Sequence, residues 1–233
     1  MRRHLQALTS LALLAALAGG CGSSSSSSSD NGIASKSPEE IVSAAKTAAK
    51  GAATVHMAGA IVKEAKPISI DLDLVAGKGA SGSLTLEGSP IEIVAVEHAL
   101  YIKGSTAFYT HIAGPAAAQL LQGKWIKAPE GAGNFSSFAQ LTELGKLLDS
   151  TLASHGTLAK GSSVTVEGEP AVTVNDTTKG ATLFVASTGT PFPLEITKSG
   201  SGSGKITFTR WNQPVTLTAP ANAININQLQ SGH

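Results

Sequence analysis

Residues 68–103 read ISIDLDLVAGKGASGSLTLEGSPIEIVAVEHALYIK, and this stretch decides the fold of the chain. Apolar and polar residues alternate at 68–74 and again at 83–87, and two further apolar segments follow, at 91–96 and 99–103. Turns rich in glycine or proline separate the segments. Short alternating strands joined by tight turns are typical of an antiparallel meander with one apolar face and one polar face.

The same two-residue period extends on both sides of this stretch. Apolar residues alternate over 55–61, and Pro67 is expected to break that run. After residue 157, alternation predicts strands at 164–166, 172–174, 182–185, 194–196 and 205–209. Residues 212–233 are expected to be mostly irregular.

One helix is predicted before the first strand. Ser37 is a good N-cap, Pro38 suits the first turn, and Glu39 and Glu40 favour the positive end of the helix dipole. Apolar residues then recur at helical spacing up to about Gly51. This helix is slim and rich in alanine, so we expect it to lie flat against a larger sheet.

A helical insert is predicted between the two sets of strands, at 105–155. Apolar residues at 108–121 predict one helix, interrupted near Gly114. A short strand is predicted at 125–127, and apolar residues at 135–152 recur at three and four, which predicts a second amphipathic helix.

This order of elements predicts an α+β fold built on one large antiparallel sheet. A sheet of about ten strands curls rather than lying flat, so we expect a half-open β-barrel. The apolar side of that sheet must be covered, and the few predicted helices are the only candidates to cover it.

The N-terminus predicts a lipid anchor. Arg2 and Arg3 are followed by an apolar run at 5–17, then by small residues and Cys21, the single cysteine of the chain. This pattern is typical of a secretory signal, and the cysteine directly after the small residues resembles the lipobox of bacterial lipoproteins. Acylation of Cys21 would attach two chains, which is enough for stable membrane binding. The alternative is an ordinary secretory signal with a chance cysteine.

The chain is therefore divided into three parts. Residues 1–20 are predicted to be the lipoprotein signal peptide, and 37–230 a single domain. Between them, 21–36 would comprise the acylated Cys21 and a flexible tether with an unbroken serine run at 23–29.

Composition excludes several classes of protein. Removing Arg2 and Arg3 from the 17 basic residues leaves 15 against 16 acidic residues, a net charge of −1. A nucleic-acid binder would carry a basic stripe instead. With Cys21 modified no thiol remains, so the fold does not depend on disulfides.

Several motif matches have simpler explanations than a functional site. Residues 77–82 satisfy G-x-G-x-x-G, but a dinucleotide site needs a helix next, whereas a strand is predicted here, so a hairpin turn is favoured. Asp71 and Asp73 share one strand face and could imitate a catalytic carboxylate pair, although a solvated face explains them more simply. Trp125 and Trp211 are expected to pack in the core or at the barrel rim.

Neither a metal site nor an active site is predicted. His56, His98, His111 and His155 are scattered, with no pair at i, i+4 spacing and no cysteine to join them. No nucleophile–base pair is apparent. We therefore expect a protein that is not an enzyme and that holds no metal or cofactor.

The order of motifs resembles the LppX/LprG family of lipid-binding lipoproteins and, more distantly, the LolA/LolB lipoprotein carriers. The resemblance is carried by the Cys21 lipobox, the helix start at 37–40, LYIKG at 100–104, WIK at 125–127 and FTRWNQP at 208–214. It implies a half-open antiparallel barrel closed by helices around an apolar cavity for acyl chains.

We expect a membrane-anchored extracytoplasmic lipoprotein of the bacterial cell envelope that binds or carries lipid or lipoprotein cargo. It would attach through its N-terminal diacylglycerol, act as a monomer and bind no nucleic acid. The alternative is a non-catalytic interaction or scaffold lipoprotein with a filled core. The residues expected to line the cavity are Ile70, Leu72, Leu84, Leu86, Ile91, Ile93, Leu100, Ile102, Phe108, Leu120 and Leu144.

Overall fold

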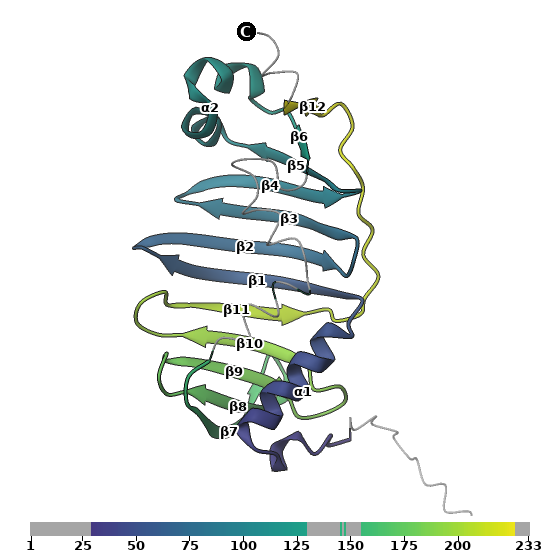
Figure 1. The fold of residues 1–233 in the computed structure, drawn as a ribbon, viewed down its shortest axis with the longest axis vertical. Coiled ribbons are helices and arrows are strands. Elements are labelled where there is room, and N and C mark those ends of the chain that lie inside the picture. The colour runs from purple at the N-terminus through teal and green to yellow at the C-terminus, as the bar shows by residue number, and fades with distance from the viewer. Residues whose placement is uncertain (1–28, 130–144, 146, 148–154, 227–233) are drawn as a thin grey trace, which may run out of the picture.

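The computed structural model describes residues 29–129, 145, 147 and 155–226, which form one long sheet with a helix near each end (Figure 1). A 3-10 turn, Ile33–Ser35, precedes the first helix. The helices are α1 (Pro38–Lys50) and α2 (Thr106–Leu121). The strands are β1 (Thr54–Lys63), β2 (Lys66–Val75), β3 (Gly79–Leu86), β4 (Ser89–Val96), β5 (Ala99–Gly104), β6 (Ile126–Pro129), β7 (Leu158–Val166), β8 (Glu169–Asp176), β9 (Ala181–Ala186), β10 (Pro193–Lys198), β11 (Gly204–Thr209) and β12 (Ile224–Asn225).

The sheet has 12 strands in the order β12-β6-β5-β4-β3-β2-β1-β11-β10-β9-β8-β7. Every pair is antiparallel except β12 with β6, and the two edge strands do not meet, so the sheet is open. The prediction of an α+β fold with one large, curled, half-open antiparallel sheet is confirmed. The two halves of the meander join where β1 pairs with β11.

The predicted turn at 77–82 was too long. Gly79 to Gly82 belong to β3, and the turn itself is shorter, with the Lys78 N–H donating to the Val75 carbonyl at 3.1 Å. Gly82 has φ +150°, and a Cβ there would overlap the carbonyl oxygen of Asp71 on β2. These glycines therefore allow close approach of strands rather than forming a loop.

Two further differences concern the strand ends. The first run of strand residues ends at Lys63, before the predicted break at Pro67. Pro67 itself lies inside β2, opposite Val62. Pro67 is only the second residue of β2, a position near a strand end where a missing N–H is tolerated. In the segment predicted to be irregular, β12 forms a short parallel pairing with β6.

The predicted N-terminal helix is confirmed. The Ser37 hydroxyl accepts a hydrogen bond from the Glu40 N–H at 3.3 Å, and the Glu40 carboxylate accepts one from the Ser37 N–H at 2.9 Å. This reciprocal capping box fixes the start of α1. Ile41, Val42 and Ala45 face the strands, and α1 packs against β7 to β10.

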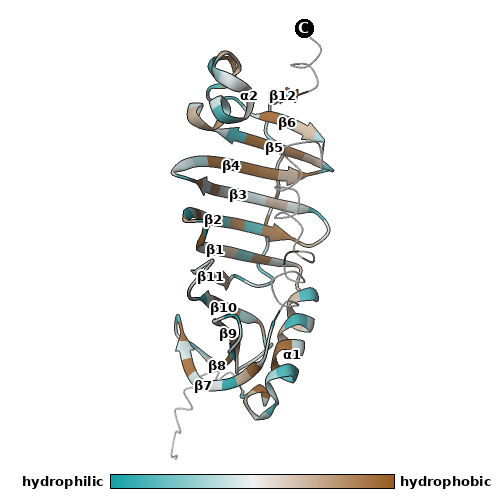
Figure 2. Ribbon diagram, turned by 60° about the vertical axis from the view of Figure 1, so that its left-hand side comes forward, coloured by the Kyte–Doolittle hydropathy of each residue, from teal (hydrophilic) through white to brown (hydrophobic). Residues whose placement is uncertain are grey.

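At the other end of the sheet, α2 packs against β4 and β5. It is interrupted at Gly114 as predicted. The predicted helix at 135–152 lies outside the described residues except at Gly145 and Leu147, which are helical. Figure 2 shows the hydrophobic residues that recur along β2 to β5, between α2 at one end and α1 at the other.

Candidate functional site

One face of the sheet is a continuous apolar surface. The register places Phe208, Met57, Leu72, Gly82, Ile93, Ile102 and Ile126 in one row across β11, β1, β2, β3, β4, β5 and β6. All of these but Gly82 belong to a single buried cluster. Because side chains two apart on a strand share a face, neighbouring rows on these strands extend the same surface.

A second row on this face contains small side chains. Leu74 is followed across the strands by Ala80, Ala95, Leu100 and Ala128, all of them buried. Because three residues of this row are alanines, and Gly82 stands in the row beside it, the side chains of the sheet fill little space above these positions. Whatever covers these positions, protein or ligand, approaches close to the backbone of β3 and β4.

The structure brings most of the predicted cavity-lining residues together. Eight of them are buried in the same cluster: Ile70, Leu72, Leu84, Ile91, Ile93, Leu100, Ile102 and Phe108. Leu86 is partly buried and packs against this cluster, as does Leu147 from the insert. Leu144 lies outside the described residues.

Leu120 is placed differently from the expectation. Its side chain is 64% exposed, so it does not pack on the sheet. On α2 it is Ala118 and Leu121, three residues apart, that face the cluster. Residues two positions apart point to different sides of a helix, so Leu120 cannot share a face with Ala118.

Tyr109 fixes α2 to the sheet. Its side chain is fully buried, and its hydroxyl accepts a hydrogen bond from the Gly104 N–H at 3.0 Å. The same hydroxyl lies 3.0 Å from the Lys124 carbonyl and 3.3 Å from the Ile102 carbonyl, and its single proton is donated to one of the two, the Lys124 carbonyl being the nearer. Burial raises the pKa of the Tyr109 phenol, because the charged form would lose its solvation.

The other face of the sheet carries a polar cluster that the sequence did not reveal. His56 lies opposite Asp73 in the β1–β2 register, with 3.0 Å between Nδ1 and Oδ1. Arg210 Nη2 lies 2.7 Å from the same Asp73 oxygen, whereas Asp71 is mostly exposed. The predicted solvated face therefore describes Asp71 better than Asp73. The register of β1 against β2 makes His56 and Asp73 cross-strand neighbours although they are distant in sequence.

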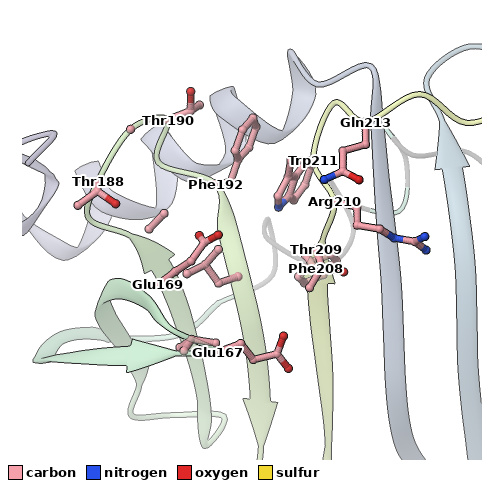
Figure 3. A pocket seen from close by; sticks show the side chains of 14 residues that line it. Glu167, Glu169, Thr188, Thr190, Phe192, Phe208, Thr209, Arg210, Trp211 and Gln213 are labelled. Atoms are coloured by element: carbon pink, nitrogen blue, oxygen red, sulfur yellow. The ribbon is translucent and has the colours of Figure 1, made fainter. Parts of the chain in front are cut away.

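A pocket of about 440 Å³ lies at one end of the sheet, where three segments meet (Figure 3). They are the β7–β8 turn with Glu167 and Glu169, residues 186–194 between β9 and β10, and residues 208–213 at the end of β11. Sequence reasoning missed this pocket because its walls come from three loops that only the strand order brings together.

Aromatic rings form one wall of this pocket. Trp211 stacks on Phe192 with 4.5 Å between ring centroids and an interplanar angle of 3°. The Trp211 indole N–H donates to the Pro193 carbonyl at 3.1 Å, which holds the ring in place. Trp211 also packs at the margin of the large apolar cluster, so the prediction of a core or rim position is confirmed for this residue.

Within the described residues, no three or more His, Cys, Asp or Glu side chains are arranged to hold a metal ion. The helices of that same part of the chain include none with the length and apolar character needed to cross a membrane.

Comparison with known proteins gives matches of structure but not of sequence. No protein-family profile and no curated protein sequence matches the chain. LprF from Mycobacterium bovis superposes with a TM-score of 0.57 at 16% identity, over 79% of this chain and 97% of LprF. The Mycobacterium tuberculosis lipoprotein LppX superposes with a TM-score of 0.52 at 18% identity, over 82% of this chain and all 100% of LppX. The resemblance predicted from the sequence is thus confirmed at the level of the fold.

Proposed function

We propose that this chain is a lipid-anchored extracytoplasmic lipoprotein that holds the acyl chains of a lipid against the apolar face of its sheet. The observation that carries the proposal is the unbroken apolar surface across seven strands, from β11 to β6. The two described helices make their main contacts near the ends of the sheet, α1 on β7 to β10 and α2 on β4 and β5. The face of β1 to β3 lies between them (Figure 1).

Hydrophobic burial alone would supply the affinity. Each methylene that leaves water contributes about 0.8 kcal/mol, so ten ordered methylenes would supply roughly 8 kcal/mol before the entropic cost of binding. No charged contact to the chains is needed. The proposal is consistent with a face that is lined by aliphatic side chains and that contains alanine or glycine at several central positions.

Cys21 is the proposed attachment point. Acylation there would place the protein on the extracytoplasmic side of a membrane, with residues 22–28 linking the lipid to the domain. A cargo lipid could then move between the membrane and the sheet without the protein leaving the surface.

The competing function is a scaffold lipoprotein with a filled core. The observation that favours it is burial: Leu72, Leu84 and Ile93 are each 1% exposed or less within the protein itself. The two functions differ in what an added side chain would meet on this face. A filled core has no room for it, whereas a lipid site has room that the lipid otherwise occupies.

The experiment enlarges buried alanines on both sides of the apolar face. Ala118→Leu on α2 and Ala80→Leu on β3 add volume to the buried cluster. Ala116→Leu is the matched control, because this residue lies on α2 and is exposed. Each variant is tested for uptake of a fluorescent fatty acid and for stability in urea.

A lipid site predicts that Ala118→Leu and Ala80→Leu reduce fatty-acid uptake several-fold with a stability change below about 1 kcal/mol. Overpacking of a filled core would instead cost about 1–3 kcal/mol. Ala116→Leu should leave both quantities unchanged. If the unmodified protein takes up no fatty acid and both buried variants are destabilised by overpacking, the lipid-carrier function is refuted and the scaffold function is favoured.

A further inference from the structure

The pocket at the end of the sheet lies beside the margin of the apolar face, because Phe208 and Trp211 line it and also pack in or against the large apolar cluster. Val172 and Val185 pack with α1, so their strand neighbours Ala171 and Ala186 point to the opposite face of the sheet. Ala186 and Leu194 belong to a small buried cluster on that opposite face and also line the pocket. The part of the cavity that these residues line, next to the β7–β8 hairpin, therefore lies outside the proposed acyl-chain site.

The pocket carries uncompensated negative charge. Neither Glu167 nor Glu169 has an ion-pair partner among the described residues, and both side chains are exposed at the β7–β8 turn. Arg210 is the one cationic residue that lines the pocket in the described part of the chain. Its guanidinium pairs with Asp73 at 2.7 Å, so its charge is already partly neutralised.

The charges and the rings face the same space. Figure 3 shows the Glu167 and Glu169 side chains extending from the β7–β8 hairpin, with Phe192 and Trp211 across from them. Carboxylates combined with aromatic rings are the groups that recognise an organic ammonium ion, through charge and through the ring quadrupole. The Arg210 side chain extends away from these groups, to the side where it pairs with Asp73 (Figure 3).

The N-terminal segment is held beside this pocket. Asn31 donates from its side chain to the carbonyls of Ala186 and Gly189, at 3.0 and 3.1 Å, and from its backbone N–H to Ser187 at 3.0 Å. Asp30 forms a β-bridge with Thr188. The loop that receives the N-terminal segment is therefore one wall of the pocket.

This attachment limits the distance from the pocket to the membrane. Eight residue steps separate Cys21 from Ser29, which a fully extended chain would span in about 28 Å. If Cys21 is acylated, this end of the sheet is the end that the anchor keeps near the lipid headgroups.

We propose that the pocket binds the ammonium group of a membrane lipid headgroup, of the phosphoethanolamine type. Glu167 and Glu169 would accept hydrogen bonds from the ammonium, and the stacked rings of Phe192 and Trp211 would border it on one side. This inference rests on the lipid anchor of the proposed function, but it does not depend on the acyl-chain site. Its role would be to orient the domain on the membrane.

The test uses the mature acylated protein in lipid nanodiscs, in a Trp125→Phe background that leaves Trp211 as the single tryptophan. Trp211 fluorescence is compared in discs containing phosphatidylethanolamine and in discs containing its N-acetylated form, which lacks the ammonium. The site variant is Glu167→Gln/Glu169→Gln. The control, Glu64→Gln/Glu97→Gln, removes the same charge from two other exposed turns. Free phosphoethanolamine is titrated in parallel.

We expect Trp211 emission to change with phosphatidylethanolamine but not with the N-acetylated lipid. The site variant should weaken this response about tenfold, equivalent to about 1.4 kcal/mol, and the control should leave it unchanged. An equal response to both lipids, or a site variant that behaves like the control, overturns the proposal. If Trp211 emission responds to free phosphoethanolamine as strongly as to discs that contain phosphatidylethanolamine, the ligand is not a membrane lipid. Failure of the protein to co-elute with the discs would instead refute the anchor.

Discussion

Replacement of Tyr109 by phenylalanine tests how α2 is held on the sheet. The change removes one oxygen and leaves the buried ring in place. It deprives the Gly104 N–H of its 3.0 Å acceptor, and it removes the donor 3.0 Å from the Lys124 carbonyl. A polar group that is left unsatisfied in a protein interior costs about 1–3 kcal/mol, and one of these groups can recover water at the helix end. We therefore expect Tyr109→Phe to lower the free energy of unfolding by about 2–3 kcal/mol.

Urea denaturation followed by circular dichroism measures this change, with an unaltered m-value showing that the same surface unfolds. Tyr101→Phe is the matched control, because this tyrosine on β5 is also buried but has Lys127 over its ring instead of a backbone network. We expect the control to cost less than about 1 kcal/mol. Equal effects of the two substitutions would show that the Tyr109 hydroxyl does not anchor α2.

Three further changes test other parts of the structure. Leu72→Ala, in the middle of the buried row, should lower the free energy of unfolding by about 2–5 kcal/mol in urea, and a loss below 1 kcal/mol would mean that this position is not tightly enclosed. Gly82→Ala should cost about 1–3 kcal/mol, because its Cβ would overlap the Asp71 carbonyl, whereas Gly51→Ala at φ −79° should cost nothing. The N–H of Gly156, with those of Lys179 and Thr178, lowers the pKa of Asp176, so its stabilisation is complete above the ordinary pKa of an aspartate and is lost as pH falls through the lowered value. Asp176→Asn should therefore destabilise the protein at pH 7 and lose that difference in acid, and a difference that is constant with pH would refute this assignment.

Local patterns predicted the elements of this fold well. Ser37, Pro38 and Glu40 specify the start of α1 by contacts within four residues, and the alternation at 68–74 specifies β2 in the same local way. Two-residue periodicity also identified which face of β2 to β5 is buried, because one side of each strand is aliphatic. The order of these elements was sufficient to predict an open, curled sheet.

Features that depend on long-range pairing could not be predicted in this way. His56 and Asp73 meet only because β1 and β2 pair in one particular register, and Asp30 meets Thr188 across most of the chain. Gly79 and Gly82 look like loop residues in sequence, although they serve strand packing. Leu120 was assigned to the sheet side because it is apolar, but α2 turns Ala118 and Leu121 inward instead.

The most direct test of the account is native mass spectrometry of the mature protein, extracted from its own membrane with a mild detergent. We predict a species heavier than the acylated polypeptide by the mass of one non-covalently bound lipid, lost in Ala118→Leu and kept in Ala116→Leu. Recovery of only the acylated polypeptide, from membranes in which the anchor itself is intact, would contradict the claim that this sheet holds acyl chains.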